Sequence, residues 1–426
     1  MLYGIVILSM KFNPYKNKVC LDSRLIKSGE FFVPVKGENF NGYEYIDQSL
    51  KNGSAGVLEL KELYLLSKEK LNKINPKIIG VTGSSGKTSM TSYLYTALSA
   101  RFKCCRGRLN TKLGLSVNVI NDMQKDCEIF IAEIGMDKAG EIADTVKMFS
   151  LDIAFITTIN HVHIEKLGSL KNLIKAKAEI LTGIKKDGVL LFNKDNEYVK
   201  KIATQFKGKK IGYGLSYASK QEIKSIISNT KLLGVHNISN LLGVKAACEI
   251  LGFTARDIPK VFRDIKSPKG RLNLLNGING SVMIDDSYNA NPESTKYALD
   301  ALVSYPGKKK IVILGDMLEL GNFEQTDHQK ILKYLSSLKY PISTILVGER
   351  FKLALSTANI DAKVFNTSRD VANAIQKKKI KISKNDIILV KGSQGIRMEI
   401  IVKALLKNSK LADKLLVRQD ARWNSK

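Results

Sequence analysis

The chain is poor in the residues that build cross-links and metal centres. Its 426 residues include four histidines, one tryptophan and five cysteines, which are Cys20, Cys104, Cys105, Cys127 and Cys248. An odd number of cysteines without a C-x-x-C spacing argues against both a disulfide framework and a zinc site. We therefore expect free thiols in a reducing compartment, which predicts a cytoplasmic protein.

Long apolar runs are also missing. No stretch reaches the roughly 18 apolar residues that a membrane-spanning helix needs, so no membrane span is expected. Residues 1–10, MLYGIVILSM, are apolar but lack a basic leader and a small-residue cleavage site, so we predict no secretory signal there. The segment is interpreted as an edge strand, or as an extension before a natural start at Met10.

Acidic residues are too few to balance the basic ones. The chain has 68 lysines and arginines against 40 aspartates and glutamates, a formal net charge of +28. Such a charge attracts polyanions, but the lysines are spread along the chain without the aromatic platform that single-strand binders use. We therefore expect small anionic substrates and no nucleic acid. The rival hypothesis, an ATPase acting on nucleic acid, predicts turnover that DNA or RNA stimulates and salt suppresses.

The pattern along the chain predicts an α/β protein of more than one domain, because 426 residues exceed one ordinary core. Residues up to 76 mix short strands with polar turns, and the lysine-rich stretch 69–76 is predicted to be a linker. Beyond it strands alternate with helices, which implies a parallel sheet covered on both faces. Strands are expected at 78–82, 129–134, 153–159 and 188–192, and helices at 88–98, 170–181 and 238–251.

A second alternating block follows Arg271 and is large enough to form a domain of its own. Strands are expected there at 282–285, 310–314, 344–347 and 387–390, and helices at 292–303, 325–338 and 398–406. The tail from Lys410 is basic and polar, and is interpreted as a final helix that frays.

The strongest motif is G-V-T-G-S-S-G-K-T at residues 80–88. It lies between a predicted strand and a predicted helix, the context that a phosphate-binding P-loop requires. Backbone N–H groups and the helix N-terminus would face the phosphates of ATP. Lys87 would bridge the β- and γ-phosphates, and the Thr88 hydroxyl would ligate Mg²⁺. The predicted ATP-binding residues of this loop are Gly83, Ser84, Ser85, Gly86, Lys87, Thr88 and Ser89.

Further polar groups follow other predicted strands. Glu133 ends a strand, on the edge where ligands bind in α/β sheets. His161 and His163 come just past the next strand, and a His-x-His pair can ligate a metal. Each has an ordinary alternative, a solvated carboxylate or structural histidines. Lys177 lies on a helix whose lysines would ordinarily form a solvated face.

The last block carries three more polar motifs. Residues 285–292, D-D-S-Y-N-A-N-P, end a strand and begin a helix, and they hold more polar groups than an N-cap needs. G-D-M-L-E-L-G at 315–321 and K-G-S at 391–393 both follow apolar strands. All three motifs are therefore expected at the ligand-binding edge of a sheet.

Taken together, these motifs resemble the Mur ligase family over nearly the whole chain. T-G-S-S-G-K-T is that family's P-loop, which accounts for Val81 where the general motif has Gly. E-I-G at 133–135, H-I-E at 163–165, A-K-A-E-I around Lys177 and H-N-x-x-N at 236–240 occur in the family's order. The motifs of the last block are most similar to the branch that adds D-alanyl-D-alanine to UDP-N-acetylmuramoyl-tripeptide.

The resemblance implies three domains, at 1–76 for the UDP substrate, 77–271 for ATP and 272–426 for the dipeptide. It also implies ATP and Mg²⁺ as cofactors, small-molecule substrates and a monomer. The expected fold class is α/β, with a central P-loop-type mostly parallel sheet, a Rossmann-like C-terminal domain and a small α/β N-terminal domain. The nearest rivals are a ligase of single amino acids (MurE-like) and an enzyme like folylpolyglutamate synthetase. A binding protein with a dead site would have lost the P-loop lysine or a metal ligand, and neither is lost here.

The resemblance also implies residue roles. Lys87, His163 and Lys177 are the expected catalytic residues, and Thr88, Glu133, His163 and Lys177 the expected metal ligands, with Lys177 carbamylated. Further ATP contacts are expected at Asn237, Arg271, Asn289 and Asn291. The expected substrate-binding residues are Ser23, Arg24, Asn110, Thr111, Asp316, Lys391 and Ser393. Gln394 stands where that branch often carries Arg, which leaves the dipeptide contacts open, with Arg397 as an alternative.

Overall fold

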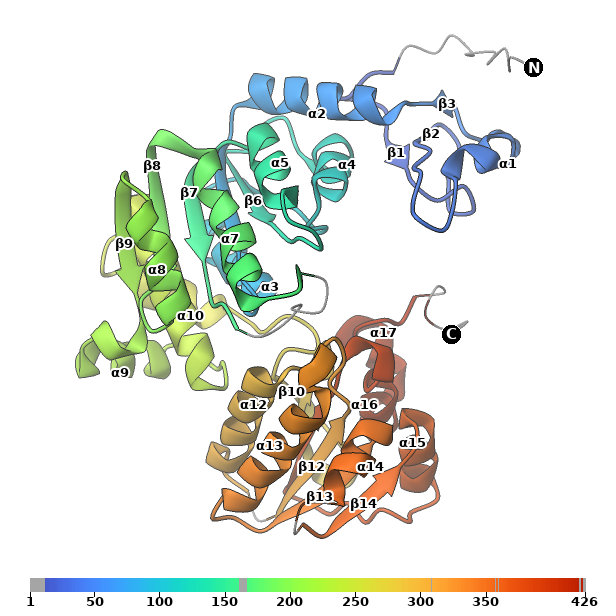
Figure 1. Ribbon diagram of the computed structural model, residues 1–426, viewed down its shortest axis with the longest axis vertical. Helices are drawn as coiled ribbons and strands as arrows, with labels where there is room; N and C mark the ends of the chain where they lie inside the picture. The colour runs from blue at the N-terminus through green and yellow to red at the C-terminus, as the bar shows by residue number, and fades with distance from the viewer. Residues whose placement is uncertain are drawn as a thin grey trace.

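The structure is a computed structural model that describes residues 12–160, 167–307, 309–356, 358, 360–420 and 423. The chain forms three sheets in sequence order, which Figure 1 shows as an N-terminal unit in blue, a central unit in cyan to green and a C-terminal unit in orange to red. Within the described residues, no helix is both long and apolar enough to cross a membrane.

The N-terminal unit is small. Its parallel sheet pairs β1 (Val19–Cys20), β2 (Phe31–Phe32) and β3 (Gly56–Val57) in that order. The turn η1 (Gly42–Tyr45) and helix α1 (Ile46–Lys51) lie between β2 and β3. Its core includes Ile120, which belongs to the central unit, so the two units share apolar contacts.

The linker predicted at 69–76 is wrong, because helix α2 (Leu60–Ile74) runs through most of it. A capping box between Glu59 and Glu62 begins the helix, and Asn75 ends it in the left-handed conformation, with φ 52°. One face, with Leu63, Ser67, Lys70 and Leu71, is buried against α4 (Lys112–Asp122). The helical spacing was hidden because lysines occupy both the solvent face and a buried position.

The central sheet confirms the predicted parallel arrangement. Its order is β5-β6-β4-β7-β8-β9, and every neighbouring pair is parallel. One face of this sheet is covered by α3 (Lys87–Leu98), α10 (Val235–Ile250) and α11 (Ile258–Asp264). The other face is covered by α4, α5 (Glu141–Met148), α7 (Leu170–Ala178) and α8 (Glu197–Gln205). α9 (Lys220–Ser228) contacts α10. The strands are β4 (Lys77–Thr82), β5 (Cys104–Arg106), β6 (Ile129–Glu133), β7 (Leu151–Ile156), β8 (Ile184–Asn193) and β9 (Lys209–Tyr213).

The C-terminal sheet has the order β10-β11-β15-β12-β13-β14, in which only the β10–β11 pair is antiparallel. One face of this sheet is covered by α12 (Pro292–Ser304), α13 (Glu324–Ser337) and α14 (Glu349–Leu355). The other face is covered by α15 (Ser368–Gln376), α16 (Glu399–Leu405) and α17 (Ala412–Leu415). The strands are β10 (Asn273–Asn276), β11 (Val282–Asp286), β12 (Lys309–Gly315), β13 (Ile342–Val347), β14 (Ala362–Phe365) and β15 (Asp386–Lys391). The second α/β block is thereby confirmed.

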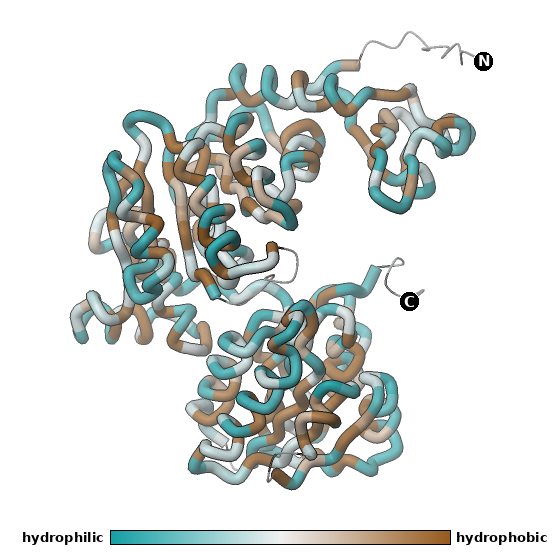
Figure 2. The backbone as a smooth tube through the Cα atoms, in the orientation of Figure 1, coloured by the Kyte–Doolittle hydropathy of each residue, from teal (hydrophilic) through white to brown (hydrophobic). Residues whose placement is uncertain are grey.

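Differences from the expected elements are mostly at their ends. β7 ends at Ile156, not at 159, because the chain turns there to carry polar residues to the sheet edge. The helix expected at 170–181 becomes a 3₁₀ turn after Ala178. Short elements such as β5 and β14 carry no long apolar run and were not expected. In Figure 2 the hydrophobic segments lie mainly along the inner strands and the hydrophilic ones along loops and outer helix faces.

Candidate active site

The P-loop is held in shape by a neighbouring strand. β4 ends at Thr82, and α3 begins at Lys87 with Gly86 as its left-handed N-cap, at φ 85°. A Cβ on Gly83 would lie 2.1 Å from Thr157 Oγ1, so a side chain cannot fit there. Thr157 and Thr158, just past β7, donate their hydroxyls to Ser85 O at 2.6 and 3.1 Å. The loop is therefore preorganised by the protein itself.

Lys87 lies across this loop. Its Nζ donates to Gly83 O at 2.9 Å and to Ser84 O at 3.4 Å. Burial lowers the pKa of Lys87, an effect that Glu133 opposes and Arg271 strengthens. An ammonium that burial destabilises gains most from a nearby anion, which fits a phosphate-binding role.

Two oxygen-bearing side chains meet beside the loop. The Thr88 hydroxyl, in the first turn of α3, donates to Glu133 Oε2 at the end of β6 over 2.9 Å. A hard cation such as Mg²⁺ prefers oxygen ligands of this kind. The pair therefore fits the predicted metal site.

Lys177 lies close enough to Lys87 and Glu133 to interact with their charges. It is on α7 and 2% exposed. Burial holds the pKa of Lys177 well below its usual value, and the charge of Lys87 lowers it further, while Glu133 raises it. The residue is therefore not on the solvated face that a lysine-rich helix suggests. The other predicted catalytic and metal-binding residue, His163, lies outside the described residues.

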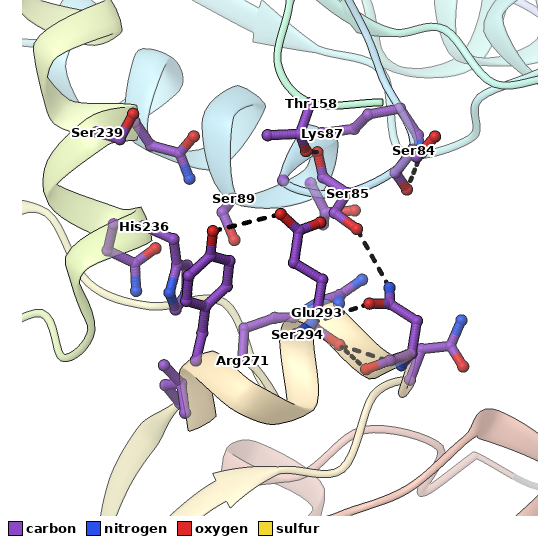
Figure 3. Close-up of a pocket in the computed structure, with 18 of the residues that line it drawn as sticks. Ser84, Ser85, Lys87, Ser89, Thr158, His236, Ser239, Arg271, Glu293 and Ser294 are labelled. Atoms are coloured by element: carbon purple, nitrogen blue, oxygen red, sulfur yellow. Dashed lines mark hydrogen bonds between the residues drawn. The ribbon is translucent and has the colours of Figure 1, made fainter. Parts of the chain in front are cut away.

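A cavity of about 310 Å³ joins the P-loop to the C-terminal unit. Figure 3 shows its walls, with the P-loop on one side and α12 on the other. Thirteen of the predicted residues line it: Ser84, Ser85, Gly86, Lys87, Thr88, Ser89, Asn110, Glu133, Asn237, Arg271, Asn289, Asn291 and Lys391. The two sheets therefore contribute jointly to one pocket.

Direct contacts cross this pocket. Ser85 Oγ accepts hydrogen bonds from Asn160 Nδ2 at 3.1 Å and from Asn291 Nδ2 at 3.2 Å. Asn160 Nδ2 also donates to the Glu293 carboxylate, which accepts from Tyr297 OH at 3.3 Å. In Figure 3, Glu293 points from α12 towards Ser85. The start of α12 is therefore fastened to the P-loop.

Asn160, Glu293 and Tyr297 were not among the predicted site residues. Asn160 follows β7 by a few residues, and Glu293 is the second residue of a helix that follows a strand. Both positions lie at the carboxyl edge of an α/β sheet, which is a signal that could have selected them. Tyr297 gives no such signal, because a tyrosine inside a helix is usually a packing residue.

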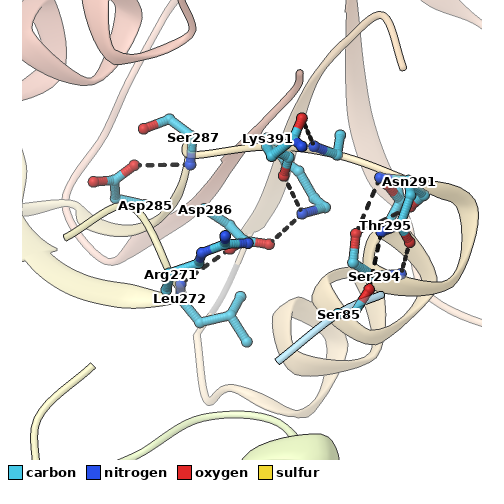
Figure 4. A network of polar contacts seen from close by, with 12 residues as sticks. Ser85, Arg271, Leu272, Asp285, Asp286, Ser287, Asn291, Ser294, Thr295 and Lys391 are labelled. Atoms are coloured by element: carbon cyan, nitrogen blue, oxygen red, sulfur yellow. Dashed lines mark hydrogen bonds and ion pairs between the residues drawn. The ribbon is translucent and has the colours of Figure 1, made fainter. Parts of the chain in front are cut away.

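A buried polar network lies under the C-terminal wall of the pocket (Figure 4). Lys391 Nζ pairs with Asp286 Oδ2 at 2.6 Å and donates to Asn289 O at 3.0 Å. Asp286 Oδ1 accepts from Leu272 N at 3.2 Å. Burial lowers the pKa of Lys391, and Asp286 opposes that shift. Lys391, predicted to bind substrate, therefore also holds the loop that carries Asn289.

Asp285 lies beside this pair and is fully buried. Its Oδ1 accepts from Ser287 N at 3.1 Å, whereas its Oδ2 has no hydrogen bond among the described residues. Burial raises the pKa of Asp285 to about 6. The two adjacent aspartates thus differ in environment, since among the residues with described positions only Asp286 has a cationic partner.

Several predicted residues make contacts that organise the local fold. Asp316 accepts the backbone N–H groups of Arg350 and Phe351, at 3.1 and 2.9 Å, and so begins α14. Ser393 Oγ accepts from Leu318 N at 2.8 Å and donates to Ala290 O at 3.3 Å. Neither Asp316 nor Ser393 lines the cavity. Their substrate-binding roles stay predictions.

Asn237 and Thr111 also have local partners. Asn237 Oδ1 accepts from Tyr93 OH at 2.9 Å, and Asn237 Nδ2 donates to Leu233 O at 2.7 Å. Thr111 Oγ1 accepts from Gly114 N at 3.1 Å as the N-cap of α4. Asn110, next to Thr111, lines the cavity.

Ser23 and Arg24 lie between β1 and β2 of the N-terminal unit and do not line the cavity. Ser23 Oγ donates to Gln48 Oε1 at 2.9 Å, and Arg24 pairs with Asp22 at 2.8 Å with its side chain 74% exposed. A substrate that contacts both these residues and the P-loop must therefore be long.

Known proteins resemble this chain in sequence. Residues 81–248 match the Mur ligase middle domain, and residues 270–394 match the Mur ligase glutamate ligase domain. The UDP-N-acetylmuramoyl-tripeptide–D-alanyl-D-alanine ligase of Bacillus subtilis is 32% identical, with 92% of this chain and 93% of that protein covered. The ligase of the same name from Rickettsia prowazekii is 30% identical, over 91% and 94%.

Solved structures share the fold. MurF from Acinetobacter baumannii aligns with a TM-score of 0.80 at 24% identity, covering 92% of this chain and 94% of that one. MurF from Thermotoga maritima in complex with ADP aligns with a TM-score of 0.79 at 22% identity, over 95% and 100%. These matches confirm the resemblance and the three-part α/β architecture. From its sequence relatives and its fold, the chain belongs to the Mur ligase family, in the MurF branch.

Proposed function

We infer that the chain is an ATP-dependent amide ligase that joins D-alanyl-D-alanine to UDP-N-acetylmuramoyl-tripeptide for peptidoglycan synthesis. The observation that carries this inference is the P-loop with its Thr88–Glu133 oxygen pair, facing a pocket that the C-terminal unit closes. Relatives of this name, similar over 92% of the chain, support the choice of substrates.

The chemistry explains why such a site is needed. A carboxylate is a poor electrophile, so a carboxylate oxygen of the tripeptide first attacks the γ-phosphorus of ATP and ADP leaves. The amine of the dipeptide then attacks the carbonyl carbon of the acyl phosphate. The C–N bond forms, and the bond between the carbonyl carbon and the phosphate oxygen breaks. Phosphate leaves with that oxygen, and the amine loses a proton. The products are UDP-N-acetylmuramoyl-pentapeptide, ADP and phosphate.

We propose that the central unit supplies the charge stabilisation. The loop N–H groups, Lys87 and Arg271 would bind the phosphates and meet the charge of the transferring phosphoryl group. Thr88 and Glu133 would hold Mg²⁺, which neutralises phosphate charge when bound. Asn289 and Asn291 would contact the nucleoside from the C-terminal side.

Lys177 is proposed to be carbamylated. The low pKa of this buried lysine favours the neutral amine, which is the form that attacks CO₂. The nitrogen lone pair forms an N–C bond with CO₂ and one proton is released, so that a cation becomes a carbamate anion. Such an anion next to Lys87 and Glu133 would give the metal site another oxygen ligand.

Replacing Lys177 with alanine is expected to lower turnover strongly and to leave an activity that acetate or formate restores in part, because a short carboxylate can occupy the emptied space. Turnover is measured as phosphate release at increasing carboxylate concentration. Lys175→Ala is the matched control, since Lys175 is exposed on the same helix. Full activity of Lys177→Ala without added carboxylate would refute the carbamate.

The ligase assignment is tested by incubating the protein with ATP, UDP-tripeptide and either D-Ala-D-Ala or a single amino acid. We expect phosphate release and a pentapeptide product only with the dipeptide. Phosphate release only with a single amino acid would point to a MurE-like ligase instead. Release that needs DNA or RNA would point to a nucleic-acid ATPase.

We also propose the domain bounds, the cellular location and the oligomeric state. The domains are assigned to 1–76, 77–271 and 272–426, and the first is proposed to bind the UDP end of the acid substrate through residues that include Ser23 and Arg24. The five cysteines form no disulfide, which agrees with a cytoplasmic location. A monomer is proposed, because one chain supplies both walls of the pocket.

A further inference from the structure

The segment after α17 contacts the loop that carries Tyr288 and Asn289. The Arg418 guanidinium donates from Nη1 to Ser287 O at 3.2 Å, and from Nη2 to Tyr288 O. Its side chain is only 6% exposed. In Figure 1 the red C-terminal segment lies at the end of its unit that faces the rest of the molecule. Arg418 therefore joins the segment after α17 to the loop that forms part of the pocket wall.

A buried carboxylate anchors Arg418. Glu399, the first residue of α16, is 0% exposed and pairs with Arg418 Nη1 at 3.0 Å and with Arg397 Nε. Arg397 and Arg418 have φ angles of 61° and 54°. Residues with a Cβ adopt this left-handed backbone at a cost in free energy, so it persists only where surrounding contacts fix it. The position of Arg418 is therefore fixed both by its ion pair with Glu399 and by the backbone conformation of the two arginines.

The Tyr288 ring connects this anchor with the nucleotide pocket. The guanidinium carbon of Arg271 lies 4.1 Å from the ring centroid, and that of Arg418 lies 5.4 Å from it. Arg271 Nε is buried and has no hydrogen bond among the described residues. Stacking on Tyr288 is therefore a contact that helps to set the direction of the Arg271 guanidinium, which lines the cavity with Lys87.

We propose that Arg418 is a positioning residue for the nucleotide. Anchored by Glu399, it fixes the backbone of Ser287 and Tyr288, and through the Tyr288 ring it directs Arg271 towards the phosphates. This inference rests on the proposed function, because it takes the pocket to be the ATP site.

Arg418→Met tests the proposal, because it removes the charge and the donors but keeps most of the side-chain length. We expect the Kd for ADP, measured by calorimetry, and the KM for ATP to rise about tenfold or more, since small misplacements of binding groups cost up to about 10²-fold. Guanidinium ion should partly restore ADP binding to Arg418→Ala. Lys414→Met, an exposed change on the same tail, should leave ADP binding unchanged.

Two further measurements separate positioning from a general effect on folding. In an Arg271→Ala background, Arg418→Met should weaken ADP binding less than about twofold, because the residue through which it acts is already gone. Tyr288→Leu leaves the Arg418–Glu399 pair in place and should weaken ADP binding as Arg418→Met does, which keeps the test valid if Arg418→Met does not fold.

An unchanged ADP affinity in folded Arg418→Met or in Tyr288→Leu would overturn the proposal, as would independent effects of Arg418 and Arg271. ADP binding needs neither acid nor amine substrate. If the wild-type protein binds ADP but forms no pentapeptide, the proposed reaction fails, while the role of Arg418 is still decided by these affinities.

Discussion

Lys87→Ala is expected to abolish measurable turnover, a loss in kcat on the order of 10³-fold, while the protein stays folded. The loss follows because the ammonium would meet charge that develops on the transferring phosphoryl group. Stability should change little, because within the described part of the chain Lys87 Nζ bonds only to carbonyls of its own loop, and burial already disfavours its charge. Turnover is measured as phosphate release with saturating substrates, and folding by circular dichroism.

Lys77→Ala is the matched control for this change. Lys77 is exposed at the opposite end of the same strand, β4, so its removal takes away the same charge far from the loop. Its activity should equal that of the unaltered protein. If Lys87→Ala kept most of its activity, the phosphate site would have to lie elsewhere.

The second large effect is expected in stability. Lys391→Met should lower the free energy of unfolding by about 3–5 kcal/mol, because it leaves the Asp286 carboxylate buried without its cationic partner. Lys391 and Asp286 are 1% and 9% exposed, and their atoms lie 2.6 Å apart. Urea unfolding followed by circular dichroism measures the change.

The double variant Asp286→Asn/Lys391→Met separates a structural role from substrate binding. It removes both charges and keeps an acceptor for Leu272 N, so most of the lost stability should return. A double variant as unstable as the single one would exclude the unpaired charge as the cause. If Lys391→Met were instead stable and raised only the KM for the dipeptide, Lys391 would act on substrate.

The sequence predicted the sheets well where apolar runs were long. β4, β6, β11 and β15 lie within a residue or two of their expected bounds, because buried parallel strands are continuously apolar. α2 was missed, since its buried face includes Ser67 and Lys70, and a buried lysine contradicts the usual apolar pattern. Lys70 is tolerated there because its Nζ donates to Ile120 O at 2.9 Å. A tertiary partner of that kind cannot be inferred from local spacing.

The positions of site residues could be predicted where a motif follows a strand of the parallel sheet. The P-loop residues and Glu133 lie together as expected, because strand ends of one parallel sheet meet at one edge. Asp316 and Ser393 also lie at such an edge, yet Asp316 binds backbone N–H groups in the first turn of α14, and Ser393 binds one in the loop after β12. Motif matching cannot separate a residue that meets substrate from one that shapes the loop beside it. Arg418 lies outside every motif and is recognisable only from its contacts.

Helix α2 has a mechanical consequence. Its 15 residues form a rod of about 22 Å that leads through Asn75 and Pro76 directly into β4, and its side is packed on α4. We expect the first two units to move as one rigid arm. Bending should then concentrate at residues 265–272, between α11 and β10, where Pro268 and Gly270 interrupt regular structure. If the C-terminal unit swings about this hinge, the pocket opens and ADP can leave. The first two units do not move relative to each other, so the distance between the UDP end of the acid substrate and the P-loop stays the same.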